Sequence, residues 1–380
     1  MTNPLSAVRR SLFLISMPMV FISFALPLRA EDLGASSFEV GVLFSLFTAS
    51  LFVLRPFVGF GLDRFGRRPF FLAALVLYLF ANALYAFSDA LDSLYIARLL
   101  QGIGFAFLSI TTDTITADLT QIDERPSAMG ANIASQARGG MVGAAVGFTL
   151  VGAIPLHAWY GSFASFTAVS LLAVVFAFRA IPETLEDHDH VPMGFRLSFP
   201  GELNRLLVPI FLMAFAASLI QPFTMIFLRD RFEVELIALA SAFLPVGLVY
   251  AILPSWLGKL TQNWRRARAM GAGLAFAGGL YLAVPHVEAF VLIIALFIGG
   301  AVGSVLAELT RNAWIGDISG GKATGQAYGI TALAAGIGST LGPLAGGAIY
   351  DGWGQDYLFY TNGLILLATT GLTLFFVARD

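Results

Sequence analysis

Long apolar segments, each of a length that crosses a bilayer, constrain this sequence of 380 residues more than any other feature. A helix rises about 1.5 Å per residue, so about 20 apolar residues cover the hydrocarbon core of a membrane. Nine such segments contain no charged residue and no histidine, and they span 11–28, 69–88, 158–178, 206–228, 236–258, 269–285, 289–307, 323–350 and 357–378. Three more segments, 40–62, 94–116 and 127–155, carry isolated charges. The pattern predicts an all-α membrane protein with twelve transmembrane helices.

The composition agrees with this class. Charged residues make up 12% of the chain, about half the share of a soluble domain, which is too few to solvate a globular surface of this size. The sequence has no cysteine, which excludes disulfides, thiol catalysis and cysteine-type zinc sites. The four histidines are scattered, so we expect no metal site and no cofactor, and a proton is the coupling ion we consider.

Positive charge in the loops predicts the orientation. One alternating set of loops, together with the two ends of the chain, holds most of the arginines and lysines, whereas the other set holds only Arg29, Arg229 and Arg231. The positive-inside rule therefore places both termini in the cytoplasm, in a multi-pass protein of the cell (inner) membrane. We expect the first segment to remain as a span, because no convincing small-residue cleavage site follows it.

A repeat relates the two halves of the chain. A shift of 199 positions aligns Arg67 with Arg266 and Asp118 with Asp317, without a gap. The same shift aligns several glycines, namely Gly59, Gly130, Gly139, Gly143 and Gly147 with Gly258, Gly329, Gly338, Gly342 and Gly346. An offset of six spans predicts parallel repeats, which place a solute site near the bilayer midplane. We expect a six-helix bundle in 1–181, a cytoplasmic linker in 182–204 and a second bundle in 205–380.

The loop between the second and third spans carries the most specific motif. It contains Gly59, Asp63 and the run Gly66-Arg67-Arg68, and this spacing resembles the signature loop of the major facilitator superfamily. One position departs from the family pattern, because Gly61 replaces the usual leucine. Further resemblances are the run 98–102 (RLLQG), the run 117–119 (ADL) and the run 182–184 (PET), so that the resemblance covers nearly the whole chain.

The resemblance implies a gate on the cytoplasmic side. In the family, the loop aspartate and the second arginine pair with an acid at the end of the fourth helix and stabilise the outward-open state. In this sequence these residues correspond to Asp63, Arg67 and Asp118. The alternative is a basic loop that only sets the orientation of the chain.

Small residues predict close helix packing. Gly59 and the triplet Gly139, Gly143 and Gly147 are expected to let neighbouring backbones approach, as are Gly342 and Pro343 in the second copy. Exporters of the superfamily typically have a Gly-Pro pair in helix five. Here the proline is in the eleventh span, and Ala144 stands at the matching position of the fifth, which weakens an assignment specific to export.

Charged residues inside spans are costly and by default mark a transport pathway. We expect Arg55 and Asp113 to lie close enough to pair, and Arg311 to pair with Glu308 three residues before it. The resemblance implies that Arg98 faces the cavity and is linked to proton transfer. The candidates for the substrate or proton pathway are Arg98, Asp113, Arg138, Glu308 and Arg311, with Glu308 the best proton carrier. The alternative is an internal ion network without a role in transport.

Together these features predict a secondary active transporter that moves a small organic solute by alternating access, as proton-coupled efflux. Its expected partners are the solute and the lipid bilayer, with no nucleic acid, and we expect a monomer. An excess of arginine in the spans keeps open an uptake or facilitative transporter of an organic anion, or an uncoupled translocator of a lipid or amphiphile. An enzyme is not expected, because no P-loop, HExxH motif or aspartate-rich cluster is present.

Overall fold

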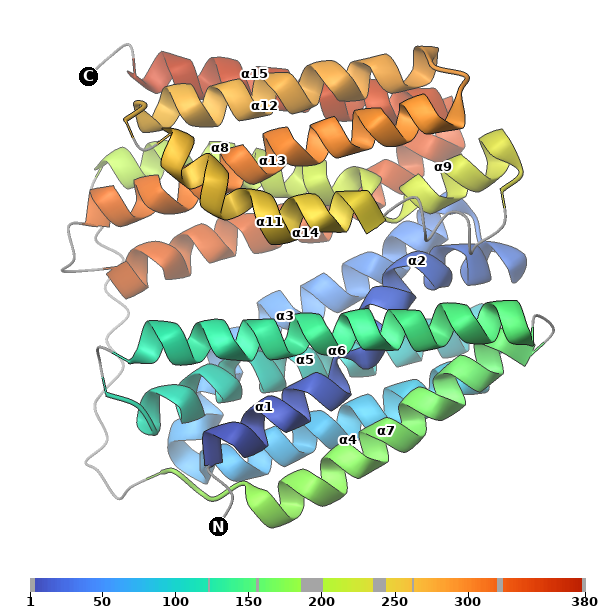
Figure 1. Ribbon diagram of the computed structural model, residues 1–380, viewed down its shortest axis with the longest axis vertical. Helices are drawn as coiled ribbons and strands as arrows, with labels where there is room; N and C mark the ends of the chain where they lie inside the picture. Colours follow the sequence, from blue (N-terminus) through green and yellow to red (C-terminus); the bar gives the residue numbers. More distant parts are fainter. Residues whose placement is uncertain are drawn as a thin grey trace. The chain divides into compact units, whose positions relative to one another are not determined.

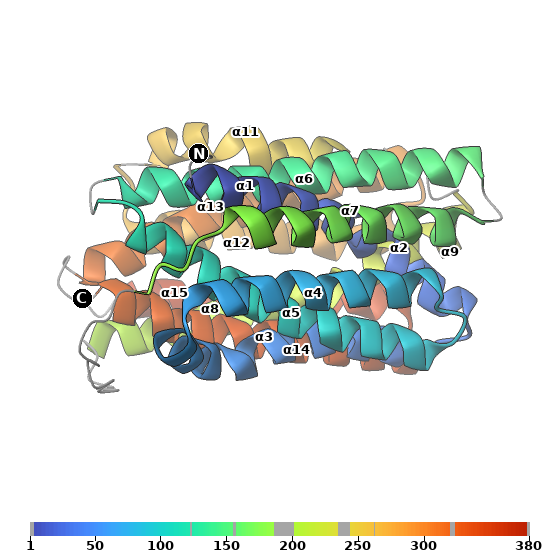
Figure 2. The same ribbon diagram turned by 90° about the horizontal axis from the view of Figure 1, so that it is seen from below.

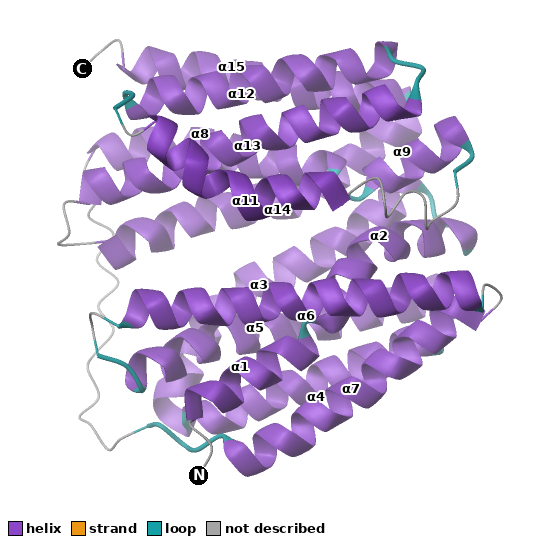
Figure 3. Ribbon diagram, viewed as in Figure 1, coloured by secondary structure: helices purple, strands orange, loops and turns teal. Residues whose placement is uncertain are grey.

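The computed structural model describes residues 4–121, 124–154, 157–185, 201–234, 244–261, 263–319 and 324–377. Helices make up almost all of this part of the chain, and it contains no strand (Figure 3). The prediction of an all-α protein is therefore confirmed. Most of the expected linker, 182–204, lies outside the described residues.

Contacts divide the chain into two compact units. Unit 1 comprises Met1–Ala35 with Leu46–Gly194, and unit 2 comprises Ser36–Ser45 with Phe195–Asp380. The division between Gly194 and Phe195 falls inside the expected linker. The grouping of Ser36–Ser45 with the second unit was not predicted.

The helices of the first half are shown from blue to green in Figure 1. They are α1 (Pro4–Ile15), α2 (Met17–Asp32), α3 (Ser37–Phe65), α4 (Arg67–Ala86), α5 (Leu91–Asp118), α6 (Arg125–Ala153) and α7 (Ala158–Ala180). Those of the second half are α8 (Gly201–Ile220), α9 (Phe223–Phe232), α11 (Leu244–Thr261), α12 (Arg266–Ala283), the short 3-10 helix η2 (Val284–His286), α13 (Phe290–Ser319), α14 (Thr324–Trp353) and α15 (Gln355–Val377).

Each predicted span corresponds to one helix or to one broken helix. Within the described residues, 10 helical segments are long and apolar enough to cross a membrane. Two of them are broken helices: α1 and α2 form the first span, and α8 and α9 form the seventh. The two remaining predicted spans correspond to α6 and α11.

In unit 1, the buried core lies between α1, α4, α5 and α7. Leu12 and Ile15 of α1 pack in one cluster with Phe71 and Tyr78 of α4 and with Leu108 of α5. These side chains lie on the faces that the helices turn toward one another, which leaves other faces of α3, α6 and α7 exposed and rich in apolar residues.

The glycines of α6 bring this helix against α1 and α2, which cross it obliquely in Figure 1, and α1 lies next to α6 in Figure 2. A Cβ atom at Gly139 would meet the carbonyl oxygen of Phe13, and one at Gly143 would meet that of Met17. At Gly147 it would meet the ring of Phe21. The helices approach so closely that no side chain fits between them.

Unit 2 repeats this arrangement. Added Cβ atoms at Gly338, Gly342 and Gly346 of α14 would meet backbone atoms of α8, among them the carbonyl oxygens of Phe211, Phe215 and Leu219. The prediction for Gly59 is not borne out among the described residues, where nothing beyond its own stretch of helix lies within 4 Å of the Cβ that a substitution there would add. Gly59 lies on an open side of α3, next to the exposed side chains of Phe57 and Phe60.

The first turns of α3 account for the grouping of Ser36–Ser45 with unit 2. The carboxylate of Asp351 in α14 accepts hydrogen bonds from the backbone N–H groups of Ser37, at 3.0 Å, and Phe38, at 2.8 Å. A Cβ at Gly41 would meet the carbonyl oxygen of Pro343. Pro343 thus lies at a close contact between α14 and the beginning of α3.

Candidate functional site

Arg67 contacts both other residues of the expected cytoplasmic gate, Asp63 and Asp118. It lies in the first turn of α4, directly after Gly66, whose φ of +92° makes the turn from α3. Its Nε donates to Oδ2 of Asp118 at 3.1 Å, and its terminal nitrogen lies 3.6 Å from Oδ1 of Asp63. The side chain of Arg67 is 12% exposed and that of Asp118 is 27% exposed, so the bridge is partly shielded from water.

Glu183 fastens the end of α7 to the same loop. Its carboxylate accepts hydrogen bonds from the backbone N–H groups at the start of α4 and in its own loop, donated by Arg67, Arg68, Thr184 and Leu185 at 2.8, 3.1, 2.9 and 2.9 Å. Partial burial alone would raise the pKa of Glu183, but these four N–H donors together lower it below its ordinary value. A Cβ at Gly66 would collide with this carboxylate, so a glycine is needed there both for φ and for space.

Thr184 completes the cluster, because its hydroxyl donates to Oδ2 of Asp118 at 2.8 Å. Sequence reasoning did not assign a role to Glu183 or Thr184. The signal was the run 182–184 after the sixth span, which was noted only as a resemblance.

The second copy of the loop forms the matching ion pair. Nε of Arg266 donates to Oδ2 of Asp317 at 2.8 Å, which is the contact that the shift of 199 places opposite Arg67 and Asp118. The residue at the position of Asp63 is Gln262, which lies outside the described residues. The second pair is more open, with side chains 35% and 56% exposed.

Arg98 is buried within unit 1. Its guanidinium donates to Oε1 of Gln101 at 2.9 Å and lies over the ring of Phe47, 5.5 Å from the centroid. The hydroxyl of Tyr85 donates to the same Oε1 at 3.2 Å. Gly102 allows this arrangement, because a Cβ there would meet the backbone of Phe47. Sequence reasoning had missed the polar and aromatic partners of Arg98.

Arg55 and Asp113 are both exposed on unit 1 and interact electrostatically, but no ion pair forms between them. The structure therefore brings the two residues near one another without the direct pairing that we expected. Side chains of this kind at membrane depth need water or a polar partner, because lipid cannot stabilise them.

Glu308 and Arg311 form the expected pair on α13, with Oε1 of Glu308 3.3 Å from a terminal nitrogen of Arg311. The same guanidinium donates to the side-chain oxygen of Asn312 at 3.1 Å, and Tyr250 of α11 interacts electrostatically with Glu308. The hydroxyl of Tyr328 donates to the carbonyl of Asn312 at 2.9 Å. Asn312, Tyr250 and Tyr328 were not predicted.

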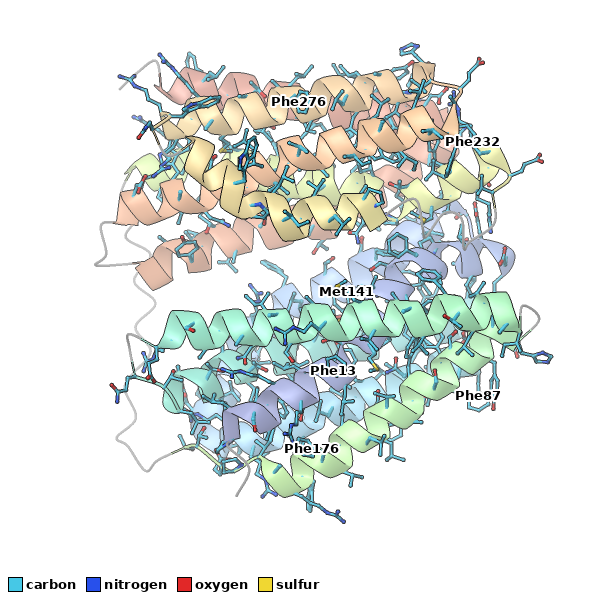
Figure 4. The ribbon with its side chains drawn as sticks, viewed as in Figure 1. Phe13, Phe87, Met141, Phe176, Phe232 and Phe276 are labelled. Atoms are coloured by element: carbon cyan, nitrogen blue, oxygen red, sulfur yellow. The ribbon has the colours of Figure 1, made fainter. Side chains whose placement is uncertain are left out.

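Arg138 belongs to a cluster of arginines on unit 1. It lines a pocket of about 860 Å³ between α1, α6 and α7, together with Arg9, Arg10 and Arg179. Figure 4 shows Phe13 and Phe176, which also line this pocket, on the side of α1, α6 and α7 that faces the reader. The convergence of these four arginines was not predicted, because it depends on how α1 packs against α6 and α7, which lie far from it in the chain.

Among the described residues, no group of three or more histidine, cysteine, aspartate or glutamate side chains is placed to hold a metal ion.

Comparison with known proteins identifies a matching family and several relatives. The family profile described as Major Facilitator Superfamily matches residues 11–310 and 248–380. Multidrug resistance protein 2 of Bacillus subtilis (strain 168) is 24% identical over 396 residues, covering 96% of this chain and 95% of the relative. The tetracycline resistance protein, class C, of Escherichia coli is 28% identical over 358 residues, covering 88% and 84%.

The fold is shared with solved structures. A bacterial homologue of the human lysosomal transporter Spinster, in an inward-facing and occupied conformation, superimposes with a TM-score of 0.82 at 15% identity, covering 100% of this chain and 98% of that one. The expected architecture of two six-helix bundles is thereby confirmed as a fold.

Proposed function

This chain belongs to the Major Facilitator Superfamily, and on that premise we propose that it exports a small organic solute by proton-coupled alternating access. Members of the family are multi-pass membrane transporters, and the relatives described above are named for resistance to drugs. Their names support efflux as the direction of transport. We further propose that the protein acts as a monomer, with both termini in the cytoplasm of a bacterium whose inner membrane it spans.

The observation that carries the proposal is the half-exposed carboxylate of Glu308 beside Arg311. A carboxylate at membrane depth is costly, and it is kept only where water or a polar partner stabilises it. The neighbouring guanidinium holds this carboxylate through a charge-assisted contact. A solute that displaces Arg311 would break that contact, and we take Glu308 as the group that carries the coupled proton.

Six further residues have proposed roles. Arg98 and Asp113 would line the pathway in the first unit, Arg98 as a fixed charge, since an arginine does not release its proton in a protein. Asp113 is exposed and would be a second acid accessible to protons. Arg311 would position Glu308. Asp63, Arg67 and Asp118 are proposed as the cytoplasmic gate.

A second candidate is an uptake or facilitative transporter of an organic anion. The observation that favours it is the charge balance of the spans, where Arg55, Arg98 and Arg311 outnumber the acids Asp113 and Glu308 even without Arg138. A positively charged path attracts anions. This candidate differs from the first in needing no proton.

Transport in proteoliposomes separates the two candidates, with tetracycline and benzoate as the first probes. Export coupled to protons predicts that an imposed pH gradient drives tetracycline against its concentration gradient. Glu308→Gln should abolish the pH-driven part and leave exchange of labelled for unlabelled tetracycline intact. Glu288→Gln, a change at an exposed loop acid, serves as the control and should retain both.

Full pH-driven transport by Glu308→Gln would exclude Glu308 as the proton carrier. Benzoate movement that ignores the pH gradient, without tetracycline transport, would favour the second candidate instead. A melting-temperature screen of drugs and organic acids would identify better probes, because a ligand that binds only the folded protein raises its stability.

A further inference from the structure

A pocket on unit 1 combines four arginines with an apolar wall. It lies between α1, α6 and α7, and its volume is about 860 Å³. Arg9, Arg10, Arg138 and Arg179 line it together with apolar side chains of α1 and α7, which are Phe13, Leu14, Leu172, Val175, Phe176 and Ala180. Ser135 is the remaining lining residue, and no acid takes part.

The positive charge of the pocket is not neutralised within the described part of the chain, where none of the four arginines forms an ion pair. The Nε of Arg9 is buried and has no hydrogen-bond partner among the described residues. Arg10 lies over the ring of Phe176, 5.9 Å from its centroid, which holds its guanidinium at the apolar wall. Four like charges this close together repel one another, so the site favours an anion.

The charged and the apolar side chains of the pocket lie at different depths along the helices. Arg9 and Arg10 lie in the second turn of α1 and Arg179 in the last turn of α7, so that three charges mark one end of the bundle. Leu14 and Leu172 lie one to two turns farther along these helices. The hydroxyl of Ser135 donates to the carbonyl of Arg9 at 2.7 Å, which places Arg138, one turn on, at the boundary between the two zones.

The apolar zone opens on the outer face of α7. Phe166, Ala173 and Ala177 form the buried stripe of this helix, whereas Leu172 and Val175 are exposed. Exposed apolar side chains on a membrane-spanning helix contact lipid chains rather than water. An occupant can therefore enter this pocket from the bilayer, with its charged end at the end of the bundle.

We propose that this pocket binds an anionic phospholipid, with the phosphate between the arginines and an acyl chain along Leu172 and Val175. Basic pockets between transmembrane helices are suited to anionic headgroups, and the apolar wall suits the chain that follows such a headgroup. Arg138 then serves lipid binding, and not the solute pathway. The inference does not depend on the transported solute.

Native mass spectrometry of the purified full-length protein tests this directly. Wild type should retain phosphatidylglycerol in preference to phosphatidylcholine with the same acyl chains. Arg138→Gln with Arg179→Gln should weaken phosphatidylglycerol binding about thirtyfold, as expected for two arginines lost near a membrane surface. Arg265→Gln with Arg268→Gln removes two exposed charges outside the pocket and should leave the preference unchanged.

The proposal would be overturned if wild type and the double variant Arg138→Gln with Arg179→Gln retained phosphatidylglycerol equally. It would also be overturned if the control variant lost as much phosphatidylglycerol as the double variant, because the attraction would then be nonspecific. Leu172→Trp keeps every charge and fills the apolar zone at an exposed position, so it decides the matter if the arginine variant does not fold. It should reduce phosphatidylglycerol retention, and unchanged retention would contradict an acyl-chain site. Millimolar inorganic phosphate is the remaining probe, and if it raised the melting temperature as much as phosphatidylglycerol, the occupant would be a soluble anion instead.

Discussion

The two copies of the loop arginine make the same ion pair in different surroundings. In unit 1, Arg67 reaches Asp118 at 3.1 Å, and their side chains are 12% and 27% exposed. In unit 2, Arg266 reaches Asp317 at 2.8 Å, and their side chains are 35% and 56% exposed. The shorter contact is thus the more hydrated one, and distance alone does not rank the two pairs.

What distinguishes unit 1 is the support around the pair. Asp63 gives Arg67 a second carboxylate, Thr184 donates to Asp118, and Glu183 binds the backbone at the start of α4. A pair that is shielded and shares its partners stabilises a fold more than an exposed pair does, because water and salt screen it less. Among the described residues, the duplicated contact therefore has these additional partners in unit 1.

The packing of the glycine helices should be equally demanding in both copies, and breaking it should have the largest effect. Gly143→Ala would press a methyl group on the carbonyl oxygen of Met17, and Gly342→Ala would press one on that of Phe215. Backbone atoms cannot give way, so each change should cost about 2–3 kcal/mol of stability. The melting temperature of the purified variants measures this, with Gly59→Ala as the control that adds its methyl group to open space.

If Gly59→Ala lowered the melting temperature as much as Gly143→Ala, the glycines would matter for reasons other than packing. The structure predicts the opposite sign for the control, because alanine favours a helix over glycine by about 1 kcal/mol.

Replacing the arginine of each copy should show how much each of the two ion pairs contributes to stability. Arg67→Gln leaves Asp118 partly buried without its cation, and it should cost about 2 kcal/mol, the magnitude of a hydrogen bond to a charged group. Arg266→Gln removes an exposed pair and should cost about 0.5 kcal/mol. Thermal unfolding of both variants at low and high salt tests the difference, and equal losses would mean that the added partners in unit 1 contribute nothing.

Acid should weaken the junction of unit 1 through Glu183. The pKa of this carboxyl is lower in the folded protein than the ordinary value of 4.5, so its contribution to stability is fully present above that value. The contribution is lost as the pH falls through the lower, folded pKa. Glu183→Gln should lower the melting temperature at neutral pH and flatten its decline in acid. A profile of the variant that runs parallel to wild type at every pH would contradict this role.

The resemblance to the family implied the pairing of Arg67 with Asp118, and the spacing of three residues predicted the pairing of Glu308 with Arg311. Sequence reasoning aligned Arg266 and Asp317 with the first pair through the shift of 199, without predicting their contact. It did not predict contacts that depend on how helices distant in the chain pack. The pocket of Arg9, Arg138 and Arg179 and the capping of α3 by Asp351 are of this second kind. Gly59 failed for a related reason, since a glycine in a loop motif looks the same as a packing glycine until its neighbours are known.

The effect on stability at Asp63 is expected to be as small as that at Arg266, and there the comparison concerns conformation. Asp63 lies 3.6 Å from Arg67 and is 64% exposed, so Asp63→Asn should cost about 0.5 kcal/mol. If this contact favours one conformation of the proposed gate, a change of that size shifts a two-state population ratio about twofold, toward inward-open. Double electron–electron resonance between spin labels on the cytoplasmic ends of α4 and α12 measures the shift, with Asp63→Glu as the charge-retaining control. Distance distributions that match wild type in both variants would show that the contact has only a structural role. A shift in Asp63→Asn alone would assign two functions to this copy of the loop. The exposed carboxylate of Asp63 would adjust the conformational equilibrium, while the shielded pair of Arg67 and Asp118 stabilises the fold.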